Sequence, residues 1–148
     1  MRNKLLQAAW VIAIIFFTAS PLAAHCEIPC GIYDDQMRIA LIAEHIQTIE
    51  KSMSQIKELE LHPSKNYNQI VRWVVNKEHH ADEIQKIVSQ YFLTQRIRPD
   101  AKNYVQNVTL LHKMLVSAMK CKQTMDPAHP SQLRALLDEF SKSYFNPK

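Results

Sequence analysis

Apolar residues in the first long stretch of the chain recur at intervals of three and four positions. This spacing places them on one face of an α-helix, which has about 3.6 residues per turn. Asp34 or Asp35 is suited to cap the start of this helix, and His62-Pro63-Ser64 predicts its end. We therefore expect a long amphipathic helix whose inner face carries Ile39, Ile42, Ala43, Ile46, Ile49, Met53, Ile56 and Leu59.

Three further stretches, at about residues 68–96, 101–122 and 131–144, show the same periodicity. Pro-containing segments, RPD after the first and DPAHP after the second, separate them. Short connections favour antiparallel neighbours, so the predicted fold is all-α, an antiparallel four-helix bundle. The aromatic side chains are interpreted as core or subunit contacts rather than as a cofactor site: Trp73, Tyr91, Phe92, Tyr104 and Phe140.

The start of the chain follows a different pattern. A short positive segment precedes an apolar run at residues 5–17, and small residues follow at positions 23 and 24. This is the layout of a secretory signal, and the apolar run is short for spanning a membrane. We predict that a maturation peptidase cuts after Ala24. The mature chain would then begin at His25 and be exported, periplasmic or extracellular, without a membrane anchor.

The composition agrees with one helical domain. The chain has 148 residues, of which 47% are hydrophobic, and a single Gly, which argues against disorder and against a sheet with many tight turns. Its net charge is +4, but without Arg2 and Lys4 sixteen basic residues face fourteen acidic ones. This small excess, with no basic cluster among aromatic residues, argues against nucleic acid as a partner.

The segment directly behind the leader, HCEIPCGIYDD, concentrates the metal-binding groups of the chain. In a chain that starts at His25, the α-amine and the amide nitrogen of Cys26 close a five-membered chelate ring around one metal ion. The Cys26 sulfur closes a second ring. The thiolate of Cys30 can fill a fourth planar position if the chain reverses direction, which Pro29 and Gly31 favour.

Such a donor set restricts the metal. Two thiolates, an ionised amide and an amine donate strongly and lie nearly in one plane, which suits Ni(II) or Cu(II) and not the tetrahedral preference of zinc. Thiolates tend to reduce Cu(II), whereas strong donors stabilise Ni(III), so nickel is favoured. The imidazole of His25 is placed to bind along the axis of the planar set.

A structural interpretation of the same residues is a small disulfide. Two Cys four positions apart in an exported protein, Cys26 and Cys30, could pair with each other. The position of His25 at the predicted cleavage point favours the metal site, because only a cleaved chain supplies the amine. Cys121 has no partner in sequence and is interpreted as a buried thiol without a catalytic role.

The segment HCEIPCGIYDDQ resembles the nickel-binding hook of nickel superoxide dismutases, whose pattern at the mature N-terminus is H-C-x-x-P-C-G-x-Y. The resemblance continues through the helical remainder of the chain to KEHHA and YF in the second predicted helix. It therefore covers essentially the whole mature protein. Every fixed position of the pattern is matched: His25, Cys26, Pro29, Cys30, Gly31 and Tyr33.

This resemblance implies a homohexamer of four-helix bundles in which each hook is held between subunits. It also implies that superoxide is disproportionated to O₂ and H₂O₂ by alternating Ni(II) and Ni(III). One nickel ion per subunit would be bound by the amine and imidazole of His25, the amide and thiolate of Cys26, and the thiolate of Cys30. Tyr33 would position superoxide or water over the open face, and Glu27 would lie near the same approach path.

The chain departs from the family pattern where the axial imidazole is oriented. Members carry a Glu in the first helix and an Arg after KE in the second, whereas here Ala40 or Leu41 and His80 occupy those places. His80 could substitute as a donor, or His79 and His80 could be a solvated pair. Adjacent helical residues do not share a face, so these two do not predict a metal site. The remaining imidazoles show no ligand spacing: His45, His62, His112 and His129.

The sequence thus predicts an exported nickel superoxide dismutase with a leader at residues 1–24, a hook at 25–33 and a helical domain at 34–148. Two alternatives stay open. One is a nickel or copper carrier that uses the same hook without turnover, and the other is a helical module with the hook cysteines in a disulfide. Tyr33 favours the enzyme, because a carrier has no need of a phenol above the metal.

Overall fold

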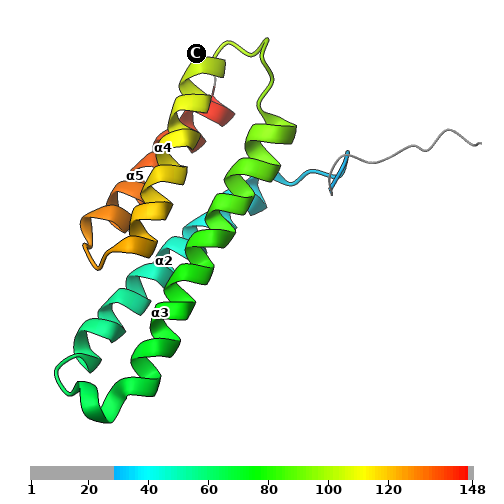
Figure 1. The fold of residues 1–148 in the computed structure, drawn as a ribbon. Helices are drawn as coiled ribbons and strands as arrows, with labels where there is room; N and C mark the ends of the chain where they lie inside the picture. The colour runs from blue at the N-terminus through cyan, green and yellow to red at the C-terminus, as the bar shows by residue number, and fades with distance from the viewer. Residues whose placement is uncertain (1–28, 147–148) are drawn as a thin grey trace, which may run out of the picture. The chain divides into compact units, whose positions relative to one another are not determined.

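The computed structural model describes residues 29–146, which form helices and contain no strand. Residues from Gly31 onward make one compact unit, and Pro29 and Cys30 belong to a separate N-terminal unit. The predicted all-α class is therefore confirmed for the described residues (Figure 1). In chain order the elements are α2 (Asp35–Leu59), α3 (Pro63–Lys86), the π-helix η1 (Ile87–Arg96), α4 (Tyr104–Gln123) and α5 (Ala128–Phe145).

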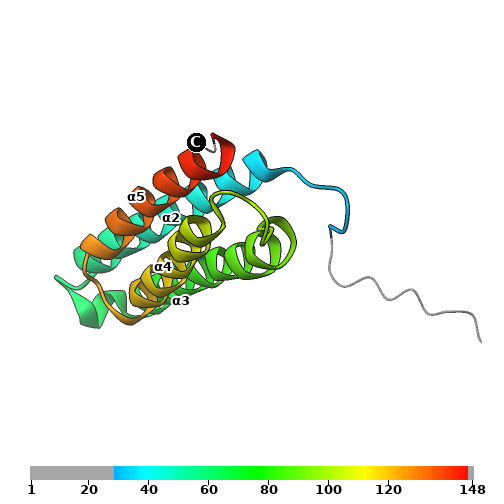
Figure 2. The same cartoon turned by 90° about the horizontal axis from the view of Figure 1, so that it is seen from above.

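The helices pack as a bundle. Helix α2 packs against α3 and α5, and α4 packs against α3 and α5 through the same shared core. Figure 2 shows α5 beside α2 and α4 beside α3, and η1 continues α3 in the same direction. The α2–α3 pair is longer than the α4–α5 pair, and the end at which α2 connects to α3 extends beyond α4 and α5 (Figure 1).

The bundle interior is apolar, as the periodicity predicts. Of the isoleucines expected on the inner face of α2, Ile39 is partly buried and the others are buried. Aromatic side chains lie at the end of the core where α2 begins. Phe92 contacts Phe140 with ring centroids 5.0 Å apart and Tyr144 at 5.7 Å. Of the aromatic residues assigned to the core, Tyr91, Phe92 and Phe140 are buried, whereas Trp73 and Tyr104 are half-buried.

The helix boundaries differ from the predicted ones mainly at prolines. The carboxylate of Asp34 accepts a hydrogen bond from the backbone N–H of Met37 at 2.9 Å, so Asp34 is the N-cap of α2. Helix α3 begins at Pro63, several residues before the predicted start, and α5 includes Pro130. Proline is compatible with the first turn of a helix because the N–H groups there have no intrahelical partner.

A buried lysine caps the end of α4. The side chain of Lys77 is 3% exposed, and its Nζ donates to the carbonyl oxygens of Cys121 at 2.5 Å and Lys122 at 2.7 Å. Carbonyls in the last turn of a helix lack intrahelical donors, so this ammonium satisfies two of them. Burial lowers the pKa of Lys77. None of the helices in residues 29–146 is both long and apolar enough to cross a membrane.

Candidate functional site

The chain turns sharply just before α2. Pro29, Cys30 and Gly31 form a turn, and Gly31 has a φ of 82°, in the left-handed region that favours glycine. Cys30 is exposed. The single glycine of the chain therefore stands at the one described position whose backbone requires it. The predicted site residues His25, Cys26 and Glu27 lie outside the described residues.

Tyr33 is held on two sides of its ring. The guanidinium carbon of Arg96 lies 4.2 Å from the ring centroid, a cation–π contact over one face. The ring of Tyr91 meets it edge to face, with centroids 5.9 Å apart and an interplanar angle of 77°. Tyr33 nevertheless remains 38% exposed. The predicted catalytic phenol thus combines a fixed ring with access to solvent.

Asp35 organises the residues beneath Tyr33. Its carboxylate accepts two hydrogen bonds from Arg96, from Nε at 2.8 Å and from Nη2 at 2.7 Å. It also accepts one from the hydroxyl of Tyr91 at 2.6 Å and one from the hydroxyl of Tyr144 at 2.8 Å. The Asp35 side chain is 15% exposed and that of Arg96 28%. One carboxylate therefore joins the first turn of α2 to η1 and α5.

These contacts shift the pKa values of all four groups. Burial alone would raise the pKa of Asp35, but the hydrogen bonds from Arg96, Tyr91 and Tyr144 outweigh it and lower the pKa. Burial and the hydrogen bond to Asp35 raise the pKa of Tyr91 and of Tyr144 to about 12. The same carboxylate, through its hydrogen bonds, raises the pKa of Arg96. At neutral pH the cluster is an ion pair with two neutral phenols.

The π-helical segment η1 brings two of the Asp35 partners onto one face. In an α-helix of about 3.6 residues per turn, residues five apart differ by about 140° around the axis. In a π-helix the hydrogen bonds join residues five apart, so such residues lie nearly above one another. Tyr91 and Arg96 are five apart, and both reach Asp35. The apolar spacing predicts a continuous α-helix here, and no sequence pattern points to a role for Arg96.

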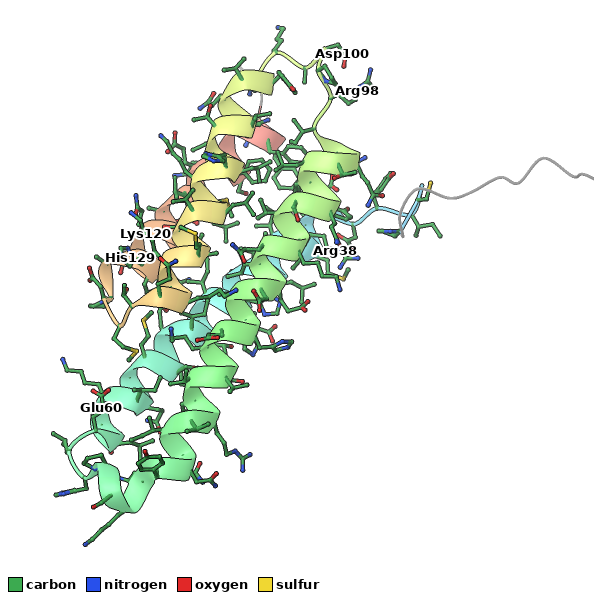
Figure 3. The ribbon with its side chains drawn as sticks, viewed as in Figure 1. Arg38, Glu60, Arg98, Asp100, Lys120 and His129 are labelled. Atoms are coloured by element: carbon green, nitrogen blue, oxygen red, sulfur yellow. The ribbon has the colours of Figure 1, made fainter. Side chains whose placement is uncertain are left out.

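A second arginine also borders Tyr91. The guanidinium carbon of Arg38 lies 5.0 Å from the Tyr91 ring centroid, and its buried Nε has no hydrogen-bond partner among the described residues. Figure 3 shows Arg38 near the start of α2. Arg38 follows Asp35 by three positions, which places both on the same side of the helix. The Tyr91 ring therefore lies among two arginines, an aspartate and Tyr33.

Two imidazoles that were assigned no common role meet across the α2–α3 contact. Nδ1 of His45 and Nδ1 of His80 are 2.7 Å apart, so one ring donates a hydrogen bond to the other. Of the two alternatives for His80, a substitute donor or a solvated pair with His79, the second does not include this contact with His45. The rings of His79 and His80 are 5.5 Å apart. Burial lowers the pKa of both His45 and His80. The pair spans 35 sequence positions, a separation that no spacing rule detects.

Among the described residues, the side chain suited to bind a metal ion is the hook thiol, Cys30. Within residues 29–146 no three His, Cys, Asp or Glu side chains gather closely enough to hold a metal ion. Cys121 is fully buried, as predicted, and burial raises the pKa of its thiol to about 11, so it is a poor thiolate donor. Cys30, by contrast, is exposed in a turn. A soft, accessible thiolate at this position fits a nickel ion held together with nitrogen donors.

Comparison with known proteins gives a consistent result. The model of the family of nickel-containing superoxide dismutases matches residues 20–148. The nickel superoxide dismutase of Streptomyces seoulensis is 24% identical over 143 residues, which cover 93% of this chain and 98% of that protein. No solved structure matches the chain. The resemblance inferred from the hook is thus confirmed, and the chain belongs to the nickel-containing superoxide dismutase family.

Proposed function

We propose that the mature chain begins at His25 and disproportionates superoxide at a nickel ion bound by its N-terminal hook. Family membership supports the activity, and the match of the hook pattern supports the site. The observation that carries the proposal is the geometry of the last residues of the hook. An exposed Cys30 and the positive φ of Gly31 are followed two residues later by Tyr33, a fixed and accessible phenol.

The ligands of this proposal come from three residues. His25 would contribute its α-amine and imidazole, Cys26 its amide nitrogen and thiolate, and Cys30 its thiolate. When bound, nickel supplies a one-electron cycle between Ni(II) and Ni(III). Over that cycle two superoxide anions and two protons become one O₂ and one H₂O₂, so one superoxide loses an electron and the other gains it.

Tyr33 would act by hydrogen bonding. Its Oη–H can donate to an oxygen of superoxide or hold a water molecule that supplies a proton. The covalent chain allows at most about 11 Å between the Cα atoms of Cys30 and Tyr33. Because the ring is contacted by both Arg96 and Tyr91, the hydroxyl has little freedom to leave its place. Glu27 would be a second polar group on the same approach path.

We also propose that the mature chain is exported and that its copies assemble into a homohexamer. A maturation peptidase would remove residues 1–24, and the mature chain would work in the periplasm or outside the cell. The proposed homohexamer needs apolar contacts between copies. An exposed apolar stripe on α3 could provide such a contact. Its residues Tyr67, Val71 and Val75 are spaced four positions apart and are 74%, 52% and 61% exposed.

The decisive test is superoxide decay by pulse radiolysis with nickel-loaded protein that begins at His25. A matched control carries one extra Ala before His25, which removes the α-amine from the chelate ring. Fast nickel-dependent decay in the His25 form alone would establish both the dismutase and the amine ligand. Nickel binding without fast decay would favour the carrier. Absence of nickel binding in both forms would favour the disulfide module.

The two hook thiolates can be tested separately from the fold. We expect Cys30→Ser or Cys26→Ser to abolish activity while the helical circular dichroism signal stays unchanged, because Cys30 is an exposed turn residue and both thiols are proposed to bind nickel. Cys121→Ser is the matched control, since it removes a thiol that is buried away from solvent. Loss of the helical signal in a hook variant would show that the pair is structural.

A further inference from the structure

The ring of Tyr33 rests on a side chain that the family pattern does not include. Arg96 is the last residue of η1, and its guanidinium carbon lies 4.2 Å from the Tyr33 ring centroid. Planar guanidinium groups stack on aromatic faces and attract them electrostatically. The contact restricts the plane of the ring, and the T-shaped contact with Tyr91 restricts it from a second side.

Arg96 is itself immobilised. Asp35 binds both Nε and Nη2 of Arg96, which is the bidentate geometry that holds a guanidinium in one orientation. Asp35 is in turn held by Tyr91, the residue that also makes the T-shaped contact with Tyr33. The contacts therefore close a ring of four residues: Tyr33 on Arg96, Arg96 on Asp35, Asp35 on Tyr91, and Tyr91 on Tyr33.

We propose that Arg96, locked by Asp35, is a positioning residue that holds the phenol of Tyr33 in the place from which it acts. The inference rests on the proposed function of Tyr33 and adds a residue to it. Arginine suits this role better than lysine, because one planar group both stacks on a ring and donates two parallel hydrogen bonds. An ammonium on the same backbone could not do both.

The geometry also indicates that Arg96 positions Tyr33 and does not itself attract the superoxide anion. Two donors of Arg96 are used by Asp35, and the charge of the guanidinium is paired with that carboxylate. Its partly buried side chain has one ring face above it. Arg96 therefore acts on superoxide through Tyr33 and not as a free cation.

The test is a double-mutant cycle in nickel-loaded protein beginning at His25. Tyr33→Phe keeps the ring and removes the hydroxyl, and Arg96→Gln removes the stacked guanidinium. We expect Arg96→Gln to lower kcat/KM for superoxide roughly tenfold when Tyr33 is present. In the Tyr33→Phe background the same substitution should cause no further loss, because there is no hydroxyl left to position.

Arg98→Gln is the matched control. Arg98 also makes a bidentate pair, with Asp100, but both side chains are exposed on the loop that follows η1 (Figure 3). The control removes the same charge two residues away and should leave the rate unchanged. An equal loss from Arg96→Gln in both Tyr33 backgrounds would overturn the proposal and assign Arg96 to attraction of the anion. No loss from Arg96→Gln would also overturn it.

A second readout needs no activity. In nickel-free protein labelled with 3-fluorotyrosine, we expect one ¹⁹F signal for each of the five tyrosines, and the Tyr33 signal is the one absent from Tyr33→Phe. We expect Arg96→Gln to move and narrow this signal as the ring is released, whereas Arg98→Gln leaves it in place. If Arg96→Gln does not fold, Arg96→Lys replaces it, since that change keeps the charge and loses the stacking.

The two readouts distinguish the possible failures. A wild-type protein without nickel-dependent dismutation but with a Tyr33 signal that depends on Arg96 would refute the proposed function and keep the positioning contact. An active wild type whose Tyr33 signal is unaffected by Arg96→Gln would refute the positioning role and keep the function.

Discussion

Asp35→Asn tests whether the cluster beneath Tyr33 stabilises the bundle. The substitution keeps the shape of the side chain and removes the charge that Arg96, Tyr91 and Tyr144 share. Hydrogen bonds to a charged group contribute about 1.5–3 kcal/mol each, but they are not additive. Asn also retains one acceptor, and Arg96 is exposed enough to regain water. We therefore expect a net loss of about 2–3 kcal/mol in the free energy of unfolding at pH 7.

The expected loss is large against a typical domain stability of about 5–15 kcal/mol, and it should lower Tm by roughly 6–10 °C. Urea unfolding followed by circular dichroism measures it directly. Asp100→Asn is the control, because its partner Arg98 and its own side chain are both exposed. Exposed ion pairs contribute little, so we expect no measurable change from the control.

The pH dependence of this loss has a defined sign. The folded-state pKa of Asp35 lies below its ordinary value of 3.8, so its contribution is fully present above pH 3.8. It is lost as pH falls through the lowered pKa. The stability gap between wild type and Asp35→Asn should therefore be constant at pH 5–7 and narrow below pH 4. A gap under about 0.5 kcal/mol at pH 7, against an expected contribution several times larger, would refute the reasoning.

Three further predictions concern other parts of the fold. Lys77→Met leaves two carbonyls at the end of α4 without donors, one of them that of Cys121, and should cost about 1–3 kcal/mol in urea unfolding; an unchanged midpoint would show that water replaces the ammonium. Because the pKa values of His45 and His80 are lowered in the folded state, the unfolded state takes up protons first as pH falls below 6.5. The free energy of unfolding should therefore decline below this pH, and His80→Gln should make that decline shallower. Gly31→Ala meets no atom within 4 Å, so its cost is the positive φ alone; we expect about fivefold weaker nickel binding with unchanged Tm, and equal affinity would contradict a strained turn.

The sequence by itself determined the helices, and it also predicted the hook. Apolar spacing of three and four residues places the isoleucines of α2 on one face, and from Ile42 to Ile56 these isoleucines are buried in the structure. Both relations are local, because a helix is defined by neighbours along the chain and the hook donors lie within six consecutive residues. The positive φ of Gly31 follows the same logic, since it is a property of one residue in one turn.

Only the tertiary structure decided what Asp35 does. In the sequence it is a possible helix cap, but Asp34 takes that role, and Asp35 instead binds Tyr91, Arg96 and Tyr144, which are 56, 61 and 109 positions away. The α-helical pattern of residues 68–96 also gave no sign of the π-helix that places two of these partners on one face.

The physical reason is that hydrophobic periodicity and polar pairing depend on different distances along the chain. An apolar stripe forms wherever local spacing repeats, and any apolar neighbour can cover it. A buried carboxylate or imidazole needs one particular partner at hydrogen-bond distance. The His45–His80 pair and the Asp35 cluster exist only because α2 packs against α3, η1 and α5 in one register. That register is set by the packing of whole helices, which no single stretch of sequence encodes.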